Sequence, residues 1–141
     1  AAAVPWAQLL AESDLVTLHC PSLPATRGMI NAAALAAAKP GLLVVNLSRG
    51  DLVDSDALVA ALDAGQVAGA ALDVFNPEPI PDGHPILGRD NVILAPHVAS
   101  VSAAAVQRLR TTAAHLAVAG MRGEPLASIV NGVAGPRVVP T

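Results

Sequence analysis

The stretch LLVVNLSRGDLVDSDALVAALDAGQVAGAALDV, residues 42–74, decides the fold. Residues 42–47 are almost entirely apolar, as expected for a strand that is buried on both faces. Asp54 is a good N-cap for a helix that Gly65 then ends, and residues 68–74 form a second apolar run. A strand, a helix and another strand in this order predict a right-handed crossover between two parallel strands.

The same alternation continues on both sides of this stretch. We expect helices at residues 4–12, from Asn31 to Pro40-Gly41, and at about 101–121, and strands at residues 15–19 and 91–95. The segment 75–90 is rich in Pro and Gly and long for a connection, so we interpret it as a functional loop. The sequence therefore predicts an α/β fold: a parallel sheet of about four strands with a long C-terminal helix.

Composition narrows the class of protein. A chain of 141 residues with 53% apolar residues has the size and core of one domain. The net charge is −3 and no Lys/Arg cluster is present, which argues against a nucleic-acid or anionic-membrane partner. Its longest apolar runs fall short of the ~20 residues that a membrane-spanning helix needs. Cys20 is the only cysteine, and this fits a reducing compartment, so we expect the cytoplasm.

Three charged or titratable residues follow short aliphatic runs, where a strand ends and a loop begins: Arg49, Glu78 and His97. Loops at strand ends carry the chemistry of many α/β folds. A guanidinium can bind a carboxylate, an imidazole can move a proton, and a carboxylate can favour the protonated imidazole. Each residue alone also has an ordinary interpretation: an exposed arginine at a strand end, a solvated glutamate, or a histidine that caps a helix. Together they favour a catalytic site.

The segments around these residues are NLSRG (46–50), LDVFNPEP (72–79) and LAPHVAS (94–100). Their sequence and spacing resemble the C-terminal catalytic half of the D-isomer-specific 2-hydroxyacid dehydrogenases, over residues 4–133. The resemblance implies a partial Rossmann-type sheet and NAD(P)-dependent interconversion of a 2-keto acid and a D-2-hydroxy acid. By the resemblance, Arg49 binds the substrate carboxylate, His97 moves the proton, and Glu78 orients and charges His97. A Glu rather than a Gln at position 78 argues against the formate-oxidising relatives.

Asp73 interrupts an otherwise apolar strand, and burying its carboxylate is costly unless it is paired or hydrogen-bonded. It is either a structural residue that accepts backbone N–H bonds or, as the resemblance implies and as we favour, a contact to the nicotinamide carboxamide. The resemblance implies NAD as cofactor, with NADP equally compatible. The full set of expected cofactor contacts is Cys20, Pro21, Thr26, Leu47, Ser48, Arg49, Asp73, His97, Ala99 and Ser100.

The glycine fingerprint G-x-G-x-x-G, which binds a pyrophosphate at a helix N-terminus, does not occur in the sequence. We therefore expect residues 1–123 to be the C-terminal half of an NAD-binding domain, and residues 124–141 to return towards a substrate domain. The resemblance implies a homodimeric parent acting on a small 2-keto or 2-hydroxy acid, without a metal. Two alternatives remain: a non-catalytic, NAD-sensing scaffold like the corepressor relatives, or a truncated fragment that is inactive by itself.

Overall fold

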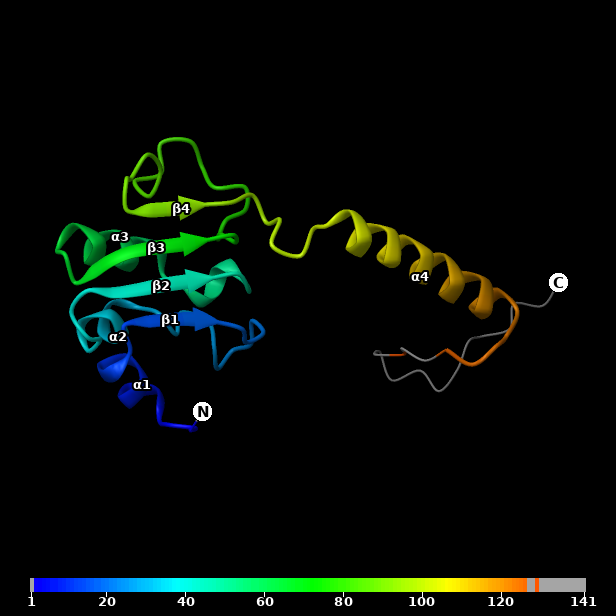
Figure 1. The fold of residues 1–141 in the computed structure, drawn as a ribbon, viewed down its shortest axis with the longest axis horizontal. Helices are drawn as coiled ribbons and strands as arrows, with labels where there is room; N and C mark the ends of the chain where they lie inside the picture. The colour runs from blue at the N-terminus through cyan, green and yellow to red at the C-terminus, as the bar shows by residue number, and fades with distance from the viewer. Residues whose placement is uncertain (1, 127–128, 130–141) are drawn as a thin grey trace. The chain divides into compact units, whose positions relative to one another are not determined.

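Four parallel strands form one sheet in the computed structural model, which describes residues 2–126 and 129. The strands are β1 (Leu15–Leu18), β2 (Leu42–Asn46), β3 (Val67–Leu72) and β4 (Val92–Leu94), and they lie side by side in the order of the sequence (Figure 1). All three neighbouring pairs are parallel. The chain divides into two units, residues 1–99 with the sheet and residues 100–141 with the last helix. The predicted α/β fold with about four parallel strands is confirmed.

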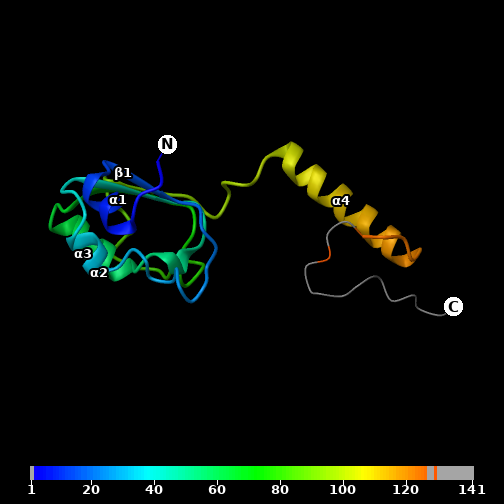
Figure 2. The same ribbon diagram turned by 90° about the horizontal axis from the view of Figure 1, so that it is seen from below.

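The first unit contains three short helices: α1 (Trp6–Glu12) precedes β1, α2 (Ala32–Ala36) connects β1 to β2, and α3 (Ser55–Asp63) lies between β2 and β3. The helices α2 and α3 lie against the same face of the sheet (Figure 2). Both begin at the predicted caps, because Asn31 accepts a hydrogen bond from the amide of Ala34 and Asp54 accepts one from the amide of Ala57. A single turn of 3₁₀ helix, η1 (Gly50–Leu52), follows β2 and was not anticipated.

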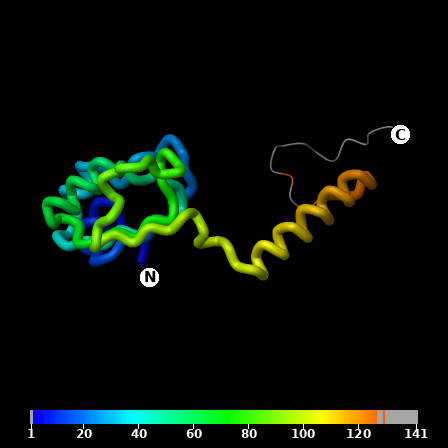
Figure 3. Tube along the Cα trace, turned by 90° about the horizontal axis from the view of Figure 1, so that it is seen from above, coloured from blue at the N-terminus to red at the C-terminus, as the bar shows by residue number. Residues whose placement is uncertain are grey.

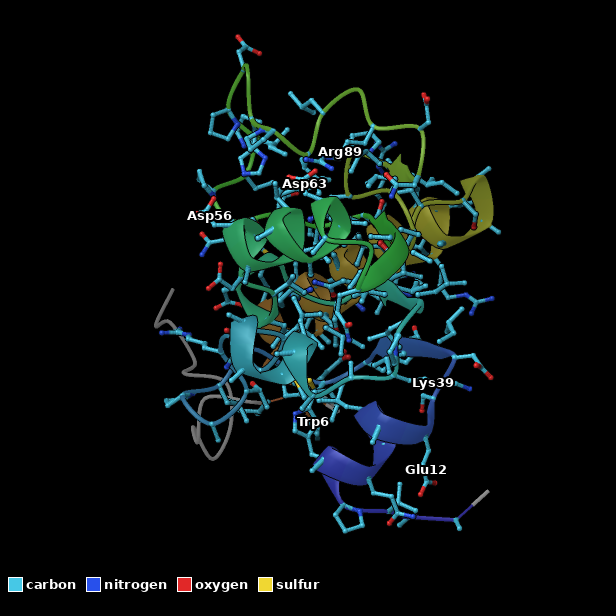
Figure 4. All side chains as sticks on the ribbon, turned by 90° about the vertical axis from the view of Figure 1, so that its left-hand side faces the viewer. Trp6, Glu12, Lys39, Asp56, Asp63 and Arg89 are labelled. Carbon is cyan, nitrogen blue, oxygen red and sulfur yellow. The ribbon has the colours of Figure 1, made fainter. Side chains whose placement is uncertain are left out.

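The connection between β3 and β4 contains no helix, as predicted for the loop 75–90 (green in Figure 3). Its closing end is attached to α3, since the guanidinium of Arg89 donates to the carboxylate of Asp63 over 2.8 Å. This hydrogen bond lowers the pKa of Asp63 and raises that of Arg89. Figure 4 views the edge of the sheet where the strands begin, and Asp63 and Arg89 lie together there.

The core lies between the sheet and its helices. Val16, Leu42 and Val44 point into it, whereas Leu15, Leu43 and Ile93 on the opposite face are 48%, 41% and 72% exposed. The expectation that β2 is buried on both faces is therefore wrong for this unit, because an apolar run does not reveal which faces are covered. The apolar run predicted the strand but not its alternating burial.

The second unit contains α4 (Ala103–Met121), which confirms the predicted long C-terminal helix. Ser102 is its N-cap and accepts a hydrogen bond from the amide of Ala105. None of the helix's residues is buried. Within residues 2–126 and 129, no helix combines the length and the apolar character required to cross a membrane. Of the predicted return segment 124–141, residues 127–128 and 130–141 lie outside the described part of the chain.

Candidate active site

The three predicted catalytic residues lie near the carboxyl ends of neighbouring strands. Arg49 comes shortly after β2, Glu78 lies in the loop after β3, and His97 follows β4. Because β2, β3 and β4 are parallel and adjacent, their carboxyl ends share one edge of the sheet, at the arrowheads in Figure 1. This edge is opposite to the one that carries the Asp63–Arg89 pair.

His97 and Glu78, nineteen positions apart in sequence, form a pair: the distance from Nδ1 of His97 to Oε1 of Glu78 is 2.8 Å. An ionised carboxylate can only accept hydrogen bonds, so Nδ1 of the imidazole carries a proton and donates it. The second ring nitrogen, Nε2, is then the atom at which the imidazole can take up or release a proton. Both side chains remain accessible, with 45% of His97 and 38% of Glu78 exposed.

The backbone of His97 has a left-handed conformation, with φ of 55°, the only positive φ of a non-glycine residue in the described chain. Asp73 stabilises it, because the carboxylate accepts hydrogen bonds from the amides of Val98 (2.7 Å) and Ala99 (2.8 Å). Asp73 follows β3 rather than lying inside the strand as predicted, and it is 2% exposed. It therefore has the structural role that we considered, and its contact with a nicotinamide stays a prediction.

Burial by itself acts to raise the pKa of Asp73. The two amide hydrogen bonds from Ala99 and Val98, helped by the charge of His97, outweigh burial and lower the pKa below its ordinary value. A carboxyl group whose pKa is lower in the folded than in the unfolded chain stabilises the fold above its unfolded pKa. That stabilisation is lost as the pH falls through the folded-state pKa.

We accordingly expect Asp73→Asn to destabilise the 141-residue chain at pH 7, because the amide has one acceptor atom for two backbone donors. The difference in unfolding free energy between the wild type and Asp73→Asn should shrink as the pH falls below the ordinary range of an aspartate. Urea denaturation from pH 7 to pH 3 measures this difference. A difference that stays constant over this range contradicts a lowered pKa for Asp73.

Arg49 presents a charged group to the surface at the same edge. Its Nη1 donates to the carbonyl of Ser48 at 2.6 Å, and it has no carboxylate partner among residues 2–126 and 129. The fully buried Asn46 shapes this turn: its side chain donates to the carbonyl of Arg49 at 2.8 Å and accepts from the amide of Ser48 at 3.1 Å. In the sequence, Asn46 interrupts an apolar strand and opens the NLSRG segment, but neither feature reveals these two hydrogen bonds.

Gly50 brings the arginine turn against the loop that carries Glu78. A Cβ atom at position 50 would lie 1.9 Å from the backbone carbonyl carbon and oxygen of Phe75. Real Cβ atoms do not approach other atoms so closely, and a backbone carbonyl cannot rotate away as a side chain can. The absence of a side chain at position 50 therefore allows the loops of Arg49 and Glu78 to pack together.

Gly50→Ala should separate these loops and destabilise the chain by more than about 3 kcal/mol, at or above the usual range for overpacking. Gly83→Ala is the matched control, since an added Cβ meets nothing within 4 Å there although φ is +76°. We expect Gly83→Ala to destabilise the chain by about 1–2 kcal/mol, from backbone strain alone. Chemical denaturation of both variants measures the difference; equal effects would show that the contact with Phe75 is unimportant.

The expected cofactor contacts fall into separate groups. Cys20, Pro21, Ser48 and Arg49 line one hollow of about 440 Å³ at the carboxyl ends of β1 and β2. Ser22, in the same loop as Cys20 and Pro21, also lines it, as does His19, which we did not expect at the site. Asp73, His97 and Ala99 form the second group, after β3 and β4. Leu47 follows β2 and is 45% exposed. Thr26 does not line the hollow, and Ser100 belongs to the second unit.

Local hydrogen bonds account for the shape of the hollow. The hydroxyl of Thr26 donates to the carbonyl of Pro21 at 2.7 Å and accepts from the amide of Leu23, so it stabilises the turn behind the crevice. Ser48 donates to the carbonyl of Cys20 at 2.9 Å and joins the two walls. A crevice at the carboxyl ends of parallel strands, with hydroxyls beside an apolar proline, fits a nucleotide.

The fold and the site define an α/β domain with a crevice suited to a nucleotide, and with Arg49 and the His97–Glu78 pair at the same edge of the sheet. Residues 1–99 match the family described as D-isomer specific 2-hydroxyacid dehydrogenase, NAD binding domain. The chain belongs to this family.

Individual relatives agree with the family match. The chain is 45% identical to a glyoxylate reductase from Thermofilum pendens, over 87% of this chain and 36% of the relative. A D-isomer specific 2-hydroxyacid dehydrogenase from Xanthobacter autotrophicus Py2, solved with NADPH and MES, is 37% identical with a TM-score of 0.75, over 89% of this chain and 51% of that one. The D-isomer specific 2-hydroxyacid dehydrogenase from Lactobacillus delbrueckii ssp. bulgaricus, in its NAD-complexed form, is 28% identical with a TM-score of 0.80. This match covers 91% of the present chain and 43% of that one. The chain thus spans about a third to a half of the length of these three relatives.

Proposed function

We propose that the chain contributes the catalytic residues of an NAD(P)-dependent dehydrogenase that interconverts a 2-keto acid and a D-2-hydroxy acid. The observation that carries this proposal is the His97–Glu78 pair at 2.8 Å, on the same sheet edge as an arginine with no carboxylate partner in the described chain. A proton donor and an anion-binding group at one edge are what the reduction of a keto acid requires. Membership of the family supports the same reaction.

Each residue has a distinct role in this proposal. Arg49 binds the substrate carboxylate with its planar fork and so orients the keto group. His97 donates the proton at Nε2 to the carbonyl oxygen during reduction, and takes it back from the hydroxyl during oxidation. Glu78 accepts the hydrogen bond from Nδ1 and stabilises the charged ring. When bound, the nicotinamide cofactor supplies the hydride that C2 of the keto acid gains.

The cofactor is NAD or NADP, and the proposed contacts come from the two groups of residues at the sheet edge. Cys20, Pro21 and Ser48 line the hollow after β1 and β2. Asp73, His97 and Ala99 belong to the second group. The rest of the proposed set is Arg49, Thr26, Leu47 and Ser100. In this proposal residues 1–123 are the C-terminal half of the cofactor domain, and residues 124–141 lead to a substrate domain.

The proposed substrate is a small 2-keto acid such as glyoxylate or hydroxypyruvate. The name of the relative from Thermofilum pendens supports glyoxylate. Glu78 supports a substrate with a hydroxyl group whose proton is transferred during the reaction, which formate lacks.

We also propose a homodimer, for which the exposed apolar face around Leu43 and Ile93 is a candidate contact surface. The free thiol of Cys20 is consistent with the proposed cytoplasmic location.

A direct assay of activity tests the proposed function. The protein assayed has the length of the relatives and contains residues 1–141, and we refer to it as the complete enzyme. Oxidation of NADH or NADPH is followed with glyoxylate, hydroxypyruvate and pyruvate, and the configuration of the product from pyruvate is determined. We expect turnover and D-lactate. Formation of L-lactate, or cofactor binding without any turnover, contradicts the proposal; the second result favours the non-catalytic, NAD-sensing alternative.

A further inference from the structure

Asp51, the residue after the Arg49-Gly50 turn, binds the loop on the other side of the hollow. Its Oδ2 accepts a hydrogen bond from the hydroxyl of Ser22 at 2.5 Å and lies 3.1 Å from Nε of Arg27. Arg27 also donates to Ser22 at 3.3 Å, so the three side chains form a closed cluster. Ser22 itself lines the hollow. One carboxylate thus connects the turn of the proposed substrate arginine to a wall of the proposed cofactor crevice.

Backbone contacts extend this connection. The amide of Gly28 donates to the carbonyl of Asp51 at 2.8 Å, and the amide of Ile30 donates to that of Leu52 at 3.1 Å. Ile30 and Val53 then form an isolated parallel bridge. These bonds join the far end of the loop to η1, while the side chain of Asp51 connects η1 to Ser22 near the crevice. The side chain of Asp51 therefore controls the part of the loop that is closest to the hollow.

The environment of the second carboxylate oxygen of Asp51 indicates that stabilising the fold is not the only role of this residue. Its Oδ1 is buried and has no hydrogen-bond partner among the described residues, although 27% of the side chain is exposed. A buried oxygen without a partner lowers stability. In addition, Asp51 places a negative charge two positions after the arginine that is to attract an anionic substrate. On charge alone, this residue should weaken substrate binding.

We infer that Asp51 is a positioning residue, which uses Ser22 and Arg27 to hold the Arg49 turn in the orientation that binds the substrate carboxylate. This inference rests on the proposed function of Arg49. Because Arg27 and Ser22 occupy the carboxylate of Asp51, this carboxylate is directed to the loop of residues 22–27 and leaves the guanidinium of Arg49 for the substrate. The same cluster fixes the two walls of the crevice to each other.

Steady-state kinetics of the complete enzyme test the inference, because a positioning role and a pure charge effect predict opposite changes in KM for Asp51→Asn. If Asp51 positions Arg49, Asp51→Asn should raise KM for the keto acid about three- to tenfold, with kcat changed less than about twofold. If only the charge of Asp51 matters, KM should fall. Ser22→Ala removes one hydrogen bond without changing any charge, so positioning predicts a smaller rise in KM and a charge effect predicts none.

Two further variants separate this inference from general destabilisation and from the proposed function. Asp63→Asn breaks a comparable exposed ion pair with Arg89 at the opposite edge of the sheet and should leave KM unchanged. In an Arg49→Ala background, Asp51→Asn should have no further effect on KM. If Arg49→Ala itself leaves KM unchanged, the proposed function fails; if Arg49→Ala raises KM and Asp51→Asn does not, only the present inference is overturned.

Hydrogen exchange of the 141-residue chain provides a readout without turnover. Asp51→Asn should accelerate amide exchange in residues 22–30 and 49–53, and the control Asp63→Asn should not change these segments. Titration with NADH should also show weaker binding by the complete enzyme when Asp51 is replaced, because Ser22 lines the proposed crevice. Unchanged exchange in both segments would overturn the positioning role.

Discussion

Replacement of His97 by asparagine in the complete enzyme is expected to lower kcat by about 10²–10⁴-fold, the usual contribution of general acid–base catalysis. Asparagine is chosen because it tolerates the left-handed backbone at this position, where φ is 55°. Its amide can still donate to Glu78, but it cannot release or take up the proton that Nε2 of the imidazole carries. The measurement is the rate of NADH oxidation at saturating keto acid.

Replacement of His97 by alanine provides the comparison, since alanine removes the ring and also disfavours the left-handed conformation. We expect both variants to lose turnover to a similar extent, and His97→Ala to be less stable than His97→Asn. The dissociation constant for NADH, measured by fluorescence, should stay close to that of the wild type. A kcat within a factor of a few of the wild type in the asparagine variant would place the proton donor elsewhere.

Replacement of Arg49 by alanine should lower kcat/KM for the keto acid by about 10²-fold or more. Hydrogen bonds to charged groups contribute about 1.5–3 kcal/mol each, and a fork that binds a carboxylate at two points makes two of them. Because the guanidinium forms no ion pair in the described chain, its removal should not expose a buried charge. The loss should appear mainly in KM, with a smaller fall in kcat because the keto group is less well oriented.

Lysine at position 49 keeps the charge and removes the fork, so its kcat/KM should lie between those of the wild type and the alanine variant. Addition of guanidinium at millimolar concentration should partly restore the activity of the alanine variant and not that of the lysine variant. If lysine performs as well as arginine, the carboxylate is held by charge alone and the two-point contact is not used.

Much of the fold could be predicted because the local signals agree with one another. Asp54 and Asn31 are helix caps in the structure as in the sequence pattern, and the strands end close to where their apolar runs end. The positions of Arg49 and His97 after strands followed from the same pattern. The distance between His97 and Glu78 did not, since it depends on the path of a loop with no regular structure.

The partners of Asp51, Asn46 and Asp73 could not be predicted, because nothing in the local sequence marks them. Asp51 and Ser22 are 29 positions apart, and only the parallel pairing of β1 with β2 brings their loops together. The buried side chain of Asn46 satisfies the arginine turn that follows it, yet a polar residue in an apolar run can equally mark a strand edge or a bulge. Which amides donate to Asp73 likewise depends on the pairing of β3 with β4, which the local sequence does not specify.

The approach of Gly50 to Phe75 has a consequence for the sequence variation that this domain tolerates. The clash begins at the Cβ atom, 1.9 Å from the neighbouring carbonyl, and every other amino acid possesses that atom. In a saturation scan, position 50 should therefore show a uniform loss for all substitutions, regardless of size, charge or polarity. At nearby positions, where the volume or charge of the side chain matters, the losses should range from mild to severe. A uniform loss therefore identifies a position at which the absence of a Cβ atom is required.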